Sequence, residues 1–210
     1  MSGRCESLHN FCKSLTKFRY PFDTADFPRN GVYVMFEDGE TAHGTDRIVR
    51  IGAHTGQNNL KQRLSEHFLK ENKNRSVFRK NIGRALLHKA NDEYLKVWNT
   101  DFTSGKNKEK YRDKFDGEKE REIERLVSEY IRKHISFAVF PVEDRELRLA
   151  LETKMTGTVS LCEECGASAG WPGRSSPQYV IRNSGLWQEQ GVAIPLADDD
   201  MKLLREITRT

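Results

Sequence analysis

The chain has 210 residues and a formal net charge of +4, with charged side chains at 31% and hydrophobic ones at 36%. No apolar run approaches the ~20 residues that a transmembrane helix needs, and the first residues lack the apolar centre of a signal peptide. We therefore expect a cytoplasmic protein with no membrane contact, of a length that suits one domain. The charge is too small to indicate nucleic acid by itself, so its distribution has to decide.

The predicted organisation is a single domain in three parts. Residues 4–18 have helical apolar spacing, and Pro21 and Pro28 then prevent that helix from continuing. Basic residues are concentrated between Lys70 and Lys96. The parts that we expect are an N-terminal arm over 1–28, a catalytic core over 29–156 that includes a basic insertion over 70–117, and a C-terminal extension over 157–210.

Hydrophobic periodicity predicts the elements of the core. β-rich runs predict strands at 32–36 and 48–52, paired antiparallel as a hairpin with a long loop. The clearest amphipathic helix spans 118–134. The remaining predictions, in chain order, are a helix that carries Leu60 to Phe68 and is capped by Asn58 or Asn59, a basic helix from Val77 to Leu87, a strand at 94–98, a loop at 100–117, a strand at 136–140, and helices at 144–156 and 198–208.

Four polar side chains offer the groups that hydrolysis of a phosphodiester needs. Tyr33 is a candidate base, although a free phenol with a pKa of ~10 requires a nearby cation to work at neutral pH. Arg63 supplies that charge and can bind a phosphate through two hydrogen bonds, and His67 projects from the same helix face one turn later. Glu152 is a hard oxygen ligand of the kind that Mg²⁺ or Mn²⁺ accepts, and such an ion would face the leaving oxygen. The alternative carboxylates for this role are Glu143, Asp144 and Glu146.

The basic stretch gives a candidate surface for the DNA backbone. Phosphate contacts of this kind add an affinity that is independent of sequence and sensitive to salt. A solvated helix face is the alternative interpretation, and the charges form a phosphate track only if they lie on the same side as the site. The residues that we expect to contact DNA are Arg50, Lys61, Arg79 and Lys80.

Two short motifs and the segment after them resemble those of the GIY-YIG nuclease family. Gly31-Val32-Tyr33 is similar to the first motif. Arg50-Ile51-Gly52 is similar to the second, in which the family carries a tyrosine at the position of Arg50. The segment 59–67 resembles the helix that follows, and Glu152 resembles the single metal-binding glutamate. For the family's later asparagine, Asn183 is the best candidate.

The resemblance implies an α/β (α+β) fold, with a small mixed or antiparallel sheet flanked by helices, and Mg²⁺-dependent DNA cleavage. It implies that Tyr33 is the base, Arg63 the phosphate clamp and Glu152 the metal ligand. An arginine followed one turn later by a histidine is similar to what some restriction-type members carry. Together with a single compact chain that has no obvious separate recognition domain, this suggests a restriction or host-defence enzyme, and a repair or mobile-element role is the alternative. A palindromic target would favour a homodimer.

Two other functions stay open. The arginine at position 50 is compatible with a non-catalytic DNA-binding module on the same scaffold. Cys162 and Cys165 form a C-x-x-C pair, which fits a zinc or thiol protein in which the cysteines carry the function. Zinc requires four ligands, and Cys5 and Cys12 would complete a four-sulfur set if the fold brings them near.

Overall fold

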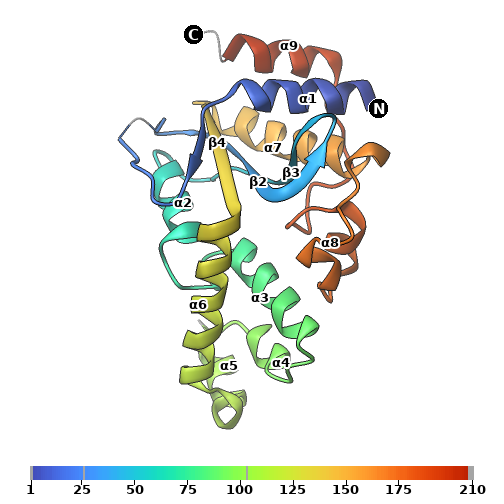
Figure 1. Cartoon of the computed structure of the whole chain (residues 1–210). Coiled ribbons are helices and arrows are strands. Elements are labelled where there is room, and N and C mark those ends of the chain that lie inside the picture. Colours follow the sequence, from blue (N-terminus) through green and yellow to red (C-terminus); the bar gives the residue numbers. More distant parts are fainter. Residues whose placement is uncertain (1, 26, 103, 208–210) are drawn as a thin grey trace.

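The computed structural model describes residues 2–25, 27–102 and 104–207, which form a four-stranded antiparallel sheet with helices on both faces (Figure 1). This architecture confirms the predicted fold class. In chain order the elements are α1 Ser2–Ser14, β1 Lys17–Arg19, β2 Gly31–Ala42, β3 Thr45–Gly52, α2 Leu60–Phe68, α3 Val77–Lys89, α4 Leu95–Trp98, α5 Gly105–Lys110, η1 Arg112–Lys114, α6 Gly117–His134, β4 Ile135–Pro141, α7 Arg145–Ser160, η2 Glu163–Cys165, η3 Pro172–Ser175, α8 Tyr179–Ser184 and α9 Asp198–Ile207.

The strand order is β1-β4-β2-β3, so β2 is an interior strand and β3 is an edge strand. Tyr33 of β2 lies opposite Gly52 of β3 on one side and Val139 of β4 on the other. The last residue of the first sequence motif is thereby paired with the last residue of the second. The hairpin brings the two motifs into register at one end of the sheet.

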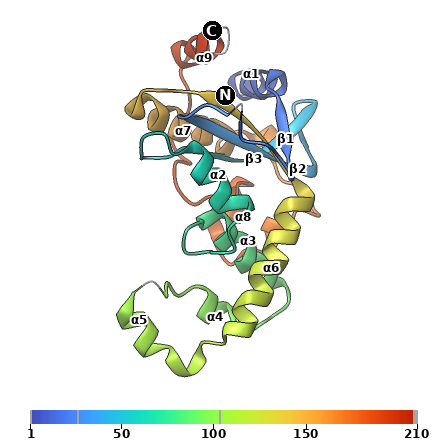
Figure 2. The same ribbon diagram turned by 90° about the vertical axis from the view of Figure 1, so that its left-hand side faces the viewer.

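Alternate side chains of β2 enter two separate hydrophobic cores, as the two-residue period of a strand requires. Val32 and Val34 pack with side chains of α1, α7 and α9. Tyr33 and Met35 pack with side chains of α2, α3 and α6 on the opposite face. Figures 1 and 2 show these two groups of helices on opposite sides of the sheet. Tyr33 therefore points towards α2, the helix that carries the predicted arginine and histidine.

The hairpin between β2 and β3 has a tight turn, and the long loop predicted there was wrong. Ala42 pairs directly with Thr45, which leaves only His43 and Gly44 in the turn. Their φ angles of 50° and 68° match a turn that needs positive φ at both central residues, the type that suits the twist of a hairpin. The polar residues of this segment suggested a solvent-exposed loop. Glu40 is instead buried in the sheet, where it forms an ion pair with Arg47.

The strand predicted at 94–98 is wrong, because these residues form the short helix α4. The carboxylate of Asp92 accepts a hydrogen bond from the Tyr94 N–H at 2.9 Å, and this local contact starts a helical turn. The loop predicted at 100–117 contains α5 and η1. Figure 2 shows this part of the insertion at the end of the molecule farthest from α1 and α9.

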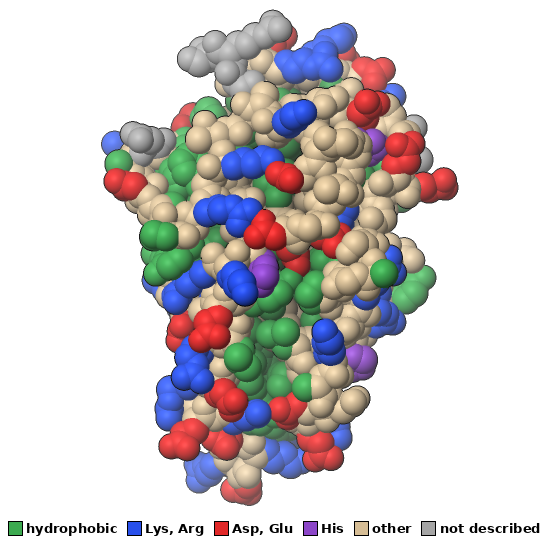
Figure 3. All heavy atoms as spheres, viewed as in Figure 1, with side chains coloured by type: hydrophobic (Ala, Val, Ile, Leu, Met, Phe, Trp, Pro, Cys, Tyr) green, Lys and Arg blue, Asp and Glu red, His purple; other side chains and the backbone are tan. Residues whose placement is uncertain are grey.

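The helices near the two ends of the chain pack together on one side of the sheet. Helix α1 buries Leu8 and Cys12 in the core on one face of the sheet, and β1 pairs with β4, so the described part of the predicted N-terminal arm contributes to the core that we expected it only to lead into. Helix α9 packs along α1. Within the described residues no helix combines the length and the apolar character that a bilayer crossing requires. On the face drawn in Figure 3, basic and acidic side chains are interspersed.

The predicted cap of α2 is not formed by a side chain. Asn59 occupies the N-cap position, but its side chain makes no capping hydrogen bond. Asn58 has a φ of 54°, and its N–H donates to the Asn30 side chain at 2.7 Å. The helix start is therefore fixed by contacts with the segment before β2, which local spacing does not reveal.

Candidate active site

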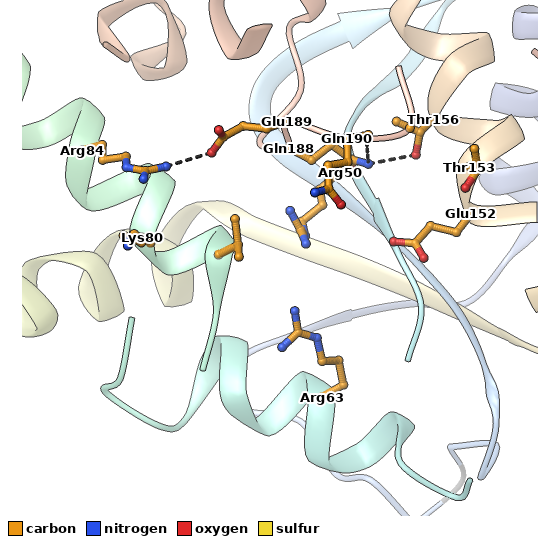
Figure 4. A pocket seen from close by; sticks show the side chains of 12 residues that line it. Arg50, Arg63, Lys80, Arg84, Glu152, Thr153, Thr156, Gln188, Glu189 and Gln190 are labelled. Carbon is orange, nitrogen blue, oxygen red and sulfur yellow. Dashed lines mark hydrogen bonds and ion pairs between the residues drawn. The ribbon is translucent and has the colours of Figure 1, made fainter. Parts of the chain in front are cut away.

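A cavity of about 480 Å³ lies at the edge of the sheet beside β3 (Figure 4). Arg50, Arg63 and Glu152 all point into it from three different elements. Four cationic side chains line it against two carboxylates, so the cavity favours an anion. The lining residues are Arg50, Arg63, Val77, Lys80, Arg84, Glu152, Thr153, Thr156, Gln188, Glu189, Gln190 and Gly191.

The position of β3 at the sheet edge explains how these residues meet. Helix α2, with Arg63, packs on one face of the sheet, and helix α7, with Glu152, packs on the other. Beyond an edge strand there is no further strand to separate the two faces. The side chains of both helices can therefore reach the same space around β3.

Tyr33 and His67 lie next to this cavity but do not line it. The Tyr33 hydroxyl lies 2.8 Å from Nε2 of His67, and both side chains are fully buried. Nδ1 of His67 lies 2.7 Å from the hydroxyl of Ser76, which caps α3 by accepting the Arg79 N–H. A His67 ring that donates from Nδ1 to Ser76 leaves Nε2 to accept the tyrosine O–H. The predicted pair is thus held in one chain of hydrogen bonds.

Burial lowers the pKa of His67 well below its usual value, and the neighbouring charges of Arg63, Arg50 and Arg79 lower it further. The histidine is therefore neutral at neutral pH. A neutral ring can accept the tyrosine hydrogen bond, whereas an imidazolium has donors at both nitrogens and could not.

This lowered pKa predicts a dependence of stability on pH. Below pH ~6.5 the histidine is protonated in the unfolded chain but stays neutral in the folded protein. The free energy of unfolding therefore falls as the pH falls from that value towards the lower pKa of the folded state. In denaturant titrations between pH 7 and pH 5 we expect His67→Gln to reduce this slope by up to about 1.4 kcal/mol per pH unit. Equal slopes in His67→Gln and in the parent protein would contradict the assignment.

Arg63 is held at the border between the buried pair and the cavity. Its Nη1 donates to the Glu66 carboxylate at 3.0 Å and to the Arg75 carbonyl oxygen at 2.7 Å. Burial acts to lower the pKa of Arg63, but the adjacent Tyr33 and Glu66 outweigh it and the pKa is raised. The guanidinium is therefore a fixed cation beside the tyrosine hydroxyl, the neighbour that the candidate base requires.

Glu152 is a half-buried carboxylate in a region of positive charge. Burial raises its pKa above the usual value, although Arg50, the backbone N–H of Ala53 and Arg63 each oppose that shift. Among the described residues no lysine or arginine lies within ion-pair distance of its carboxylate. A carboxylate that has no ion-pair partner for its negative charge and faces a cavity is suited to bind a divalent cation.

Gly52 is required by the close approach of Tyr33. A Cβ placed on Gly52 would lie 2.1 Å from the hydroxyl oxygen and from Cζ of Tyr33, far inside van der Waals contact. We expect Gly52→Ala to displace the tyrosine from His67 and to cost about 1–3 kcal/mol of stability, the usual range for overpacking. Thermal unfolding measures this. Gly56→Ala is the matched control, because its Cβ meets nothing closer than 3.5 Å; similar losses for both would contradict the steric account.

The residues expected to contact DNA divide into two groups. Arg50 and Lys80 line the cavity. Nη1 of Arg50 donates to the Trp187 carbonyl oxygen at 2.7 Å, whereas its buried Nε has no hydrogen-bond partner among the described residues. Lys61 is half-buried and lies outside the cavity lining. Arg79 is fully buried and donates to Glu124, so it cannot contact DNA in this structure and that interpretation is corrected.

Sequence reasoning missed the contribution of the C-terminal part of the chain to the cavity. Gln188 accepts the Ile51 N–H at 2.9 Å and donates to the Thr156 hydroxyl at 2.9 Å, so its carboxamide joins β3 to α7. Asn183 is exposed, contacts Tyr179 and does not line the cavity. The carboxamides at this site are therefore those of Gln188 and Gln190, and no local sequence signal marks either residue.

A comparison with protein families gives one match. A family model described as a GIY-YIG domain matches residues 5–210. The match extends well beyond the segments 31–68 and 136–156, where the sequence motifs are found. Neither the curated proteins nor the solved structures contain a match.

Proposed function

The chain belongs to the GIY-YIG family, whose members are endonucleases, and on that premise we propose that it is a metal-dependent DNA endonuclease that hydrolyses phosphodiester bonds. The observation that carries the proposal is the convergence of Arg63 from α2 and Glu152 from α7 on one cationic cavity. Tyr33 and His67 adjoin that cavity on the side of Arg63.

In this proposal the phosphate enters the cavity and is bound by Arg63 and Arg50. Guanidinium groups bind phosphate oxygens through paired hydrogen bonds and stabilise the charge that develops on them during attack. Lys80 adds a cation at the rim, where the path of a DNA backbone would continue. Lys61 would contact the DNA backbone only outside the cavity.

The base in this proposal is Tyr33. Its side chain is fully buried, so water reaches the hydroxyl when Arg63 turns from Glu66 and Arg75 towards the bound phosphate. The water oxygen bonds to phosphorus as the bond from phosphorus to the 3′ oxygen breaks, and the 3′ oxygen leaves and takes up a proton from solvent. The proton of the attacking water passes to the tyrosine oxygen, and the tyrosine's own proton moves to Nε2 of His67. The anionic phosphate offsets the arginine charges that help to lower the pKa of His67, so the histidine becomes a better proton acceptor when DNA is bound.

Glu152 is the residue that would hold the metal ion, Mg²⁺ or Mn²⁺. Its half-buried carboxylate, its raised pKa and the absence of an ion-pair partner among the described residues all fit this ligand. When bound, the ion supplies stabilisation of the charge on the leaving 3′ oxygen. The products would then carry 5′ phosphate and 3′ hydroxyl groups.

Cleavage and binding measured on one preparation test the proposal. Plasmid DNA is incubated with the protein in Mg²⁺ or Mn²⁺ for cleavage, and gel shifts are run in EDTA for binding. We expect cleavage by the parent protein and its loss in Tyr33→Phe, with DNA affinity retained in both. Equal cleavage by Tyr33→Phe would refute the role of the hydroxyl.

A non-catalytic DNA-binding module is the second candidate, and it is favoured by the arginine at position 50 and by the full burial of Tyr33. It predicts salt-sensitive DNA binding with no turnover in any metal. The same two gels therefore separate the two functions.

Within the endonuclease proposal we favour a restriction or host-defence role, because the arginine and histidine on α2 are spaced one turn apart. Cleavage of both strands of a palindromic site needs two active sites, which a homodimer would supply. Light scattering of the protein bound to DNA measures that state.

A further inference from the structure

Four potential metal ligands meet on the face of the sheet away from Tyr33. They are Cys5, His9, His43 and Cys165, and one ligand atom from each lies within 4.8 Å of all the others. Cys5 and His9 come from successive turns of α1, His43 from the β2–β3 turn and Cys165 from the end of η2. Three segments that are distant in the sequence thus contribute the four ligands: two come from α1, one from the β2–β3 turn and one from η2.

We propose that this cluster is a structural zinc site that fastens α1 to the β2–β3 hairpin and to the C-x-x-C segment. Two sulfurs and two imidazole nitrogens are a ligand set that zinc binds tetrahedrally, with neighbouring ligand atoms about 3.3–3.8 Å apart. Sγ of Cys5 lies 3.3 Å from Sγ of Cys165, which in turn lies 3.9 Å from Nε2 of His9. The spacing is therefore near that of a closed site before any ion is considered.

Burial supports a closed structural site rather than an exposed one. Cys5 is fully buried, and His9 and Cys165 are 1% and 2% exposed. The His43 side chain is 2% exposed, although its backbone lies in a surface turn. Two histidines and two thiols in the apolar core give few strong hydrogen bonds to one another, and a metal ion would satisfy all four groups at once.

Outer contacts of both imidazoles have the form found around metal-bound histidines. Nδ1 of His9 lies 2.9 Å from the Cys5 carbonyl oxygen, and a proton on Nδ1 leaves the lone pair on Nε2, the nitrogen near Cys165. The Ile48 N–H donates to Nε2 at 3.4 Å, and this long hydrogen bond would give way when an ion binds that nitrogen. Nδ1 of His43 lies 3.4 Å from the Glu164 carboxylate, an acceptor that would orient this ring in the same way.

The cluster corrects the four-sulfur set considered from the sequence. Cys12 is buried one turn beyond His9 but is not part of the group. Cys162 lies at its margin, with Sγ 3.4 Å from Nε2 of His43. In this cluster two histidines stand where that four-sulfur set would have Cys12 and Cys162. The site is separate from Glu152, so it concerns the stability of the fold and not the metal ion of the proposed cleavage.

Metal analysis under reducing conditions tests the proposal. The full chain is purified without chelator, and zinc is measured by mass spectrometry of the element. We expect about one zinc per chain, retained in Glu152→Ala. Replacement by Co²⁺ should give the visible bands of a tetrahedral site and thiolate charge transfer. Removal of zinc with a strong chelator should lower the Tm by about 10 °C, as loss of a tightly bound structural ligand does.

The cysteine variants assign the ligands. Cys5→Ser and Cys165→Ser should lose stoichiometric zinc, whereas Cys12→Ser, a buried cysteine on the same helix as Cys5, and Cys162→Ser should keep it. If a variant does not fold, the Co²⁺ spectrum of the parent protein still decides. Substoichiometric zinc after reconstitution, no tetrahedral Co²⁺ spectrum, equal loss in Cys12→Ser or Cys162→Ser, or a Cys5–Cys165 disulfide in the native protein would each overturn the proposal.

Discussion

Replacing Glu152 by alanine is expected to lower the rate of Mg²⁺-dependent DNA cleavage by about 10³-fold or more, because the leaving oxygen loses its electrostatic stabilisation. DNA affinity in EDTA should stay the same or increase, since the substitution removes a negative charge from a cavity that also holds Arg50 and Arg63. The Tm should not fall, because burial already disfavours the charged form of this carboxylate. Single-turnover cleavage and gel shifts of one preparation measure the first two effects.

Glu146→Ala is the matched control for this prediction. Glu146 lies on the same helix, six residues before Glu152, and is exposed. The Glu146→Ala variant should cleave DNA at the rate of the parent protein. If Glu152→Ala retained the parent rate in Mg²⁺, or if Glu146→Ala lost as much activity, Glu152 would not be the metal ligand.

Replacing Glu124 by alanine is expected to cost about 3–5 kcal/mol of stability, because it leaves the buried charge of Arg79 without its counter-ion. Glu124 Oε2 accepts hydrogen bonds from Nε and Nη2 of Arg79 at 3.0 and 2.6 Å. The same guanidinium also donates to the His67 carbonyl oxygen at 3.2 Å, so the pair supports the helix that carries the proposed site. For a chain of this length the Tm should fall by about 10 °C or more.

Two further variants separate this effect from general damage to α6. Glu122→Ala removes an exposed carboxylate whose contact with Lys119 is 3.6 Å long, and it should change stability by less than about 1 kcal/mol. The double variant Arg79→Met with Glu124→Leu replaces the pair by apolar side chains and should recover most of the lost stability. It should also bind DNA as the parent does, because Arg79 is buried; weakened binding in a stable double variant would contradict that placement.

The parts of the site that could be predicted from the sequence are those set by short-range geometry. The strand at 32–36 is fixed by a run of β-branched and aromatic residues, and its antiparallel pairing with the next strand was predicted, whereas the register that sets Tyr33 opposite Gly52 was not. Arg63 and His67 are separated by one helical turn, so their shared face could be deduced from spacing alone. The family resemblance of these segments then led to Glu152, which the structure places on the same cavity as Arg63.

The features that could not be predicted depend on long-range contacts. Arg79 looks like any cation on a basic helix until α6 places Glu124 beside it, 45 residues later in the chain. Gln188 enters the cavity only because the C-terminal part of the chain returns to β3. The cysteine and histidine cluster was hidden for the same reason, since His9 and His43 have no metal-binding spacing relative to the C-x-x-C pair.

The most direct test of the central claim is an analysis of the ends that the parent protein produces on a labelled DNA duplex. The claim is that Tyr33, Arg63 and Glu152 act together on one phosphodiester bond. It predicts strand cleavage that requires Mg²⁺ or Mn²⁺, stops in EDTA, and leaves 5′ phosphate and 3′ hydroxyl ends. Folded protein that binds the duplex but leaves it intact in both metals, or that leaves 3′ phosphate ends, would contradict the claim.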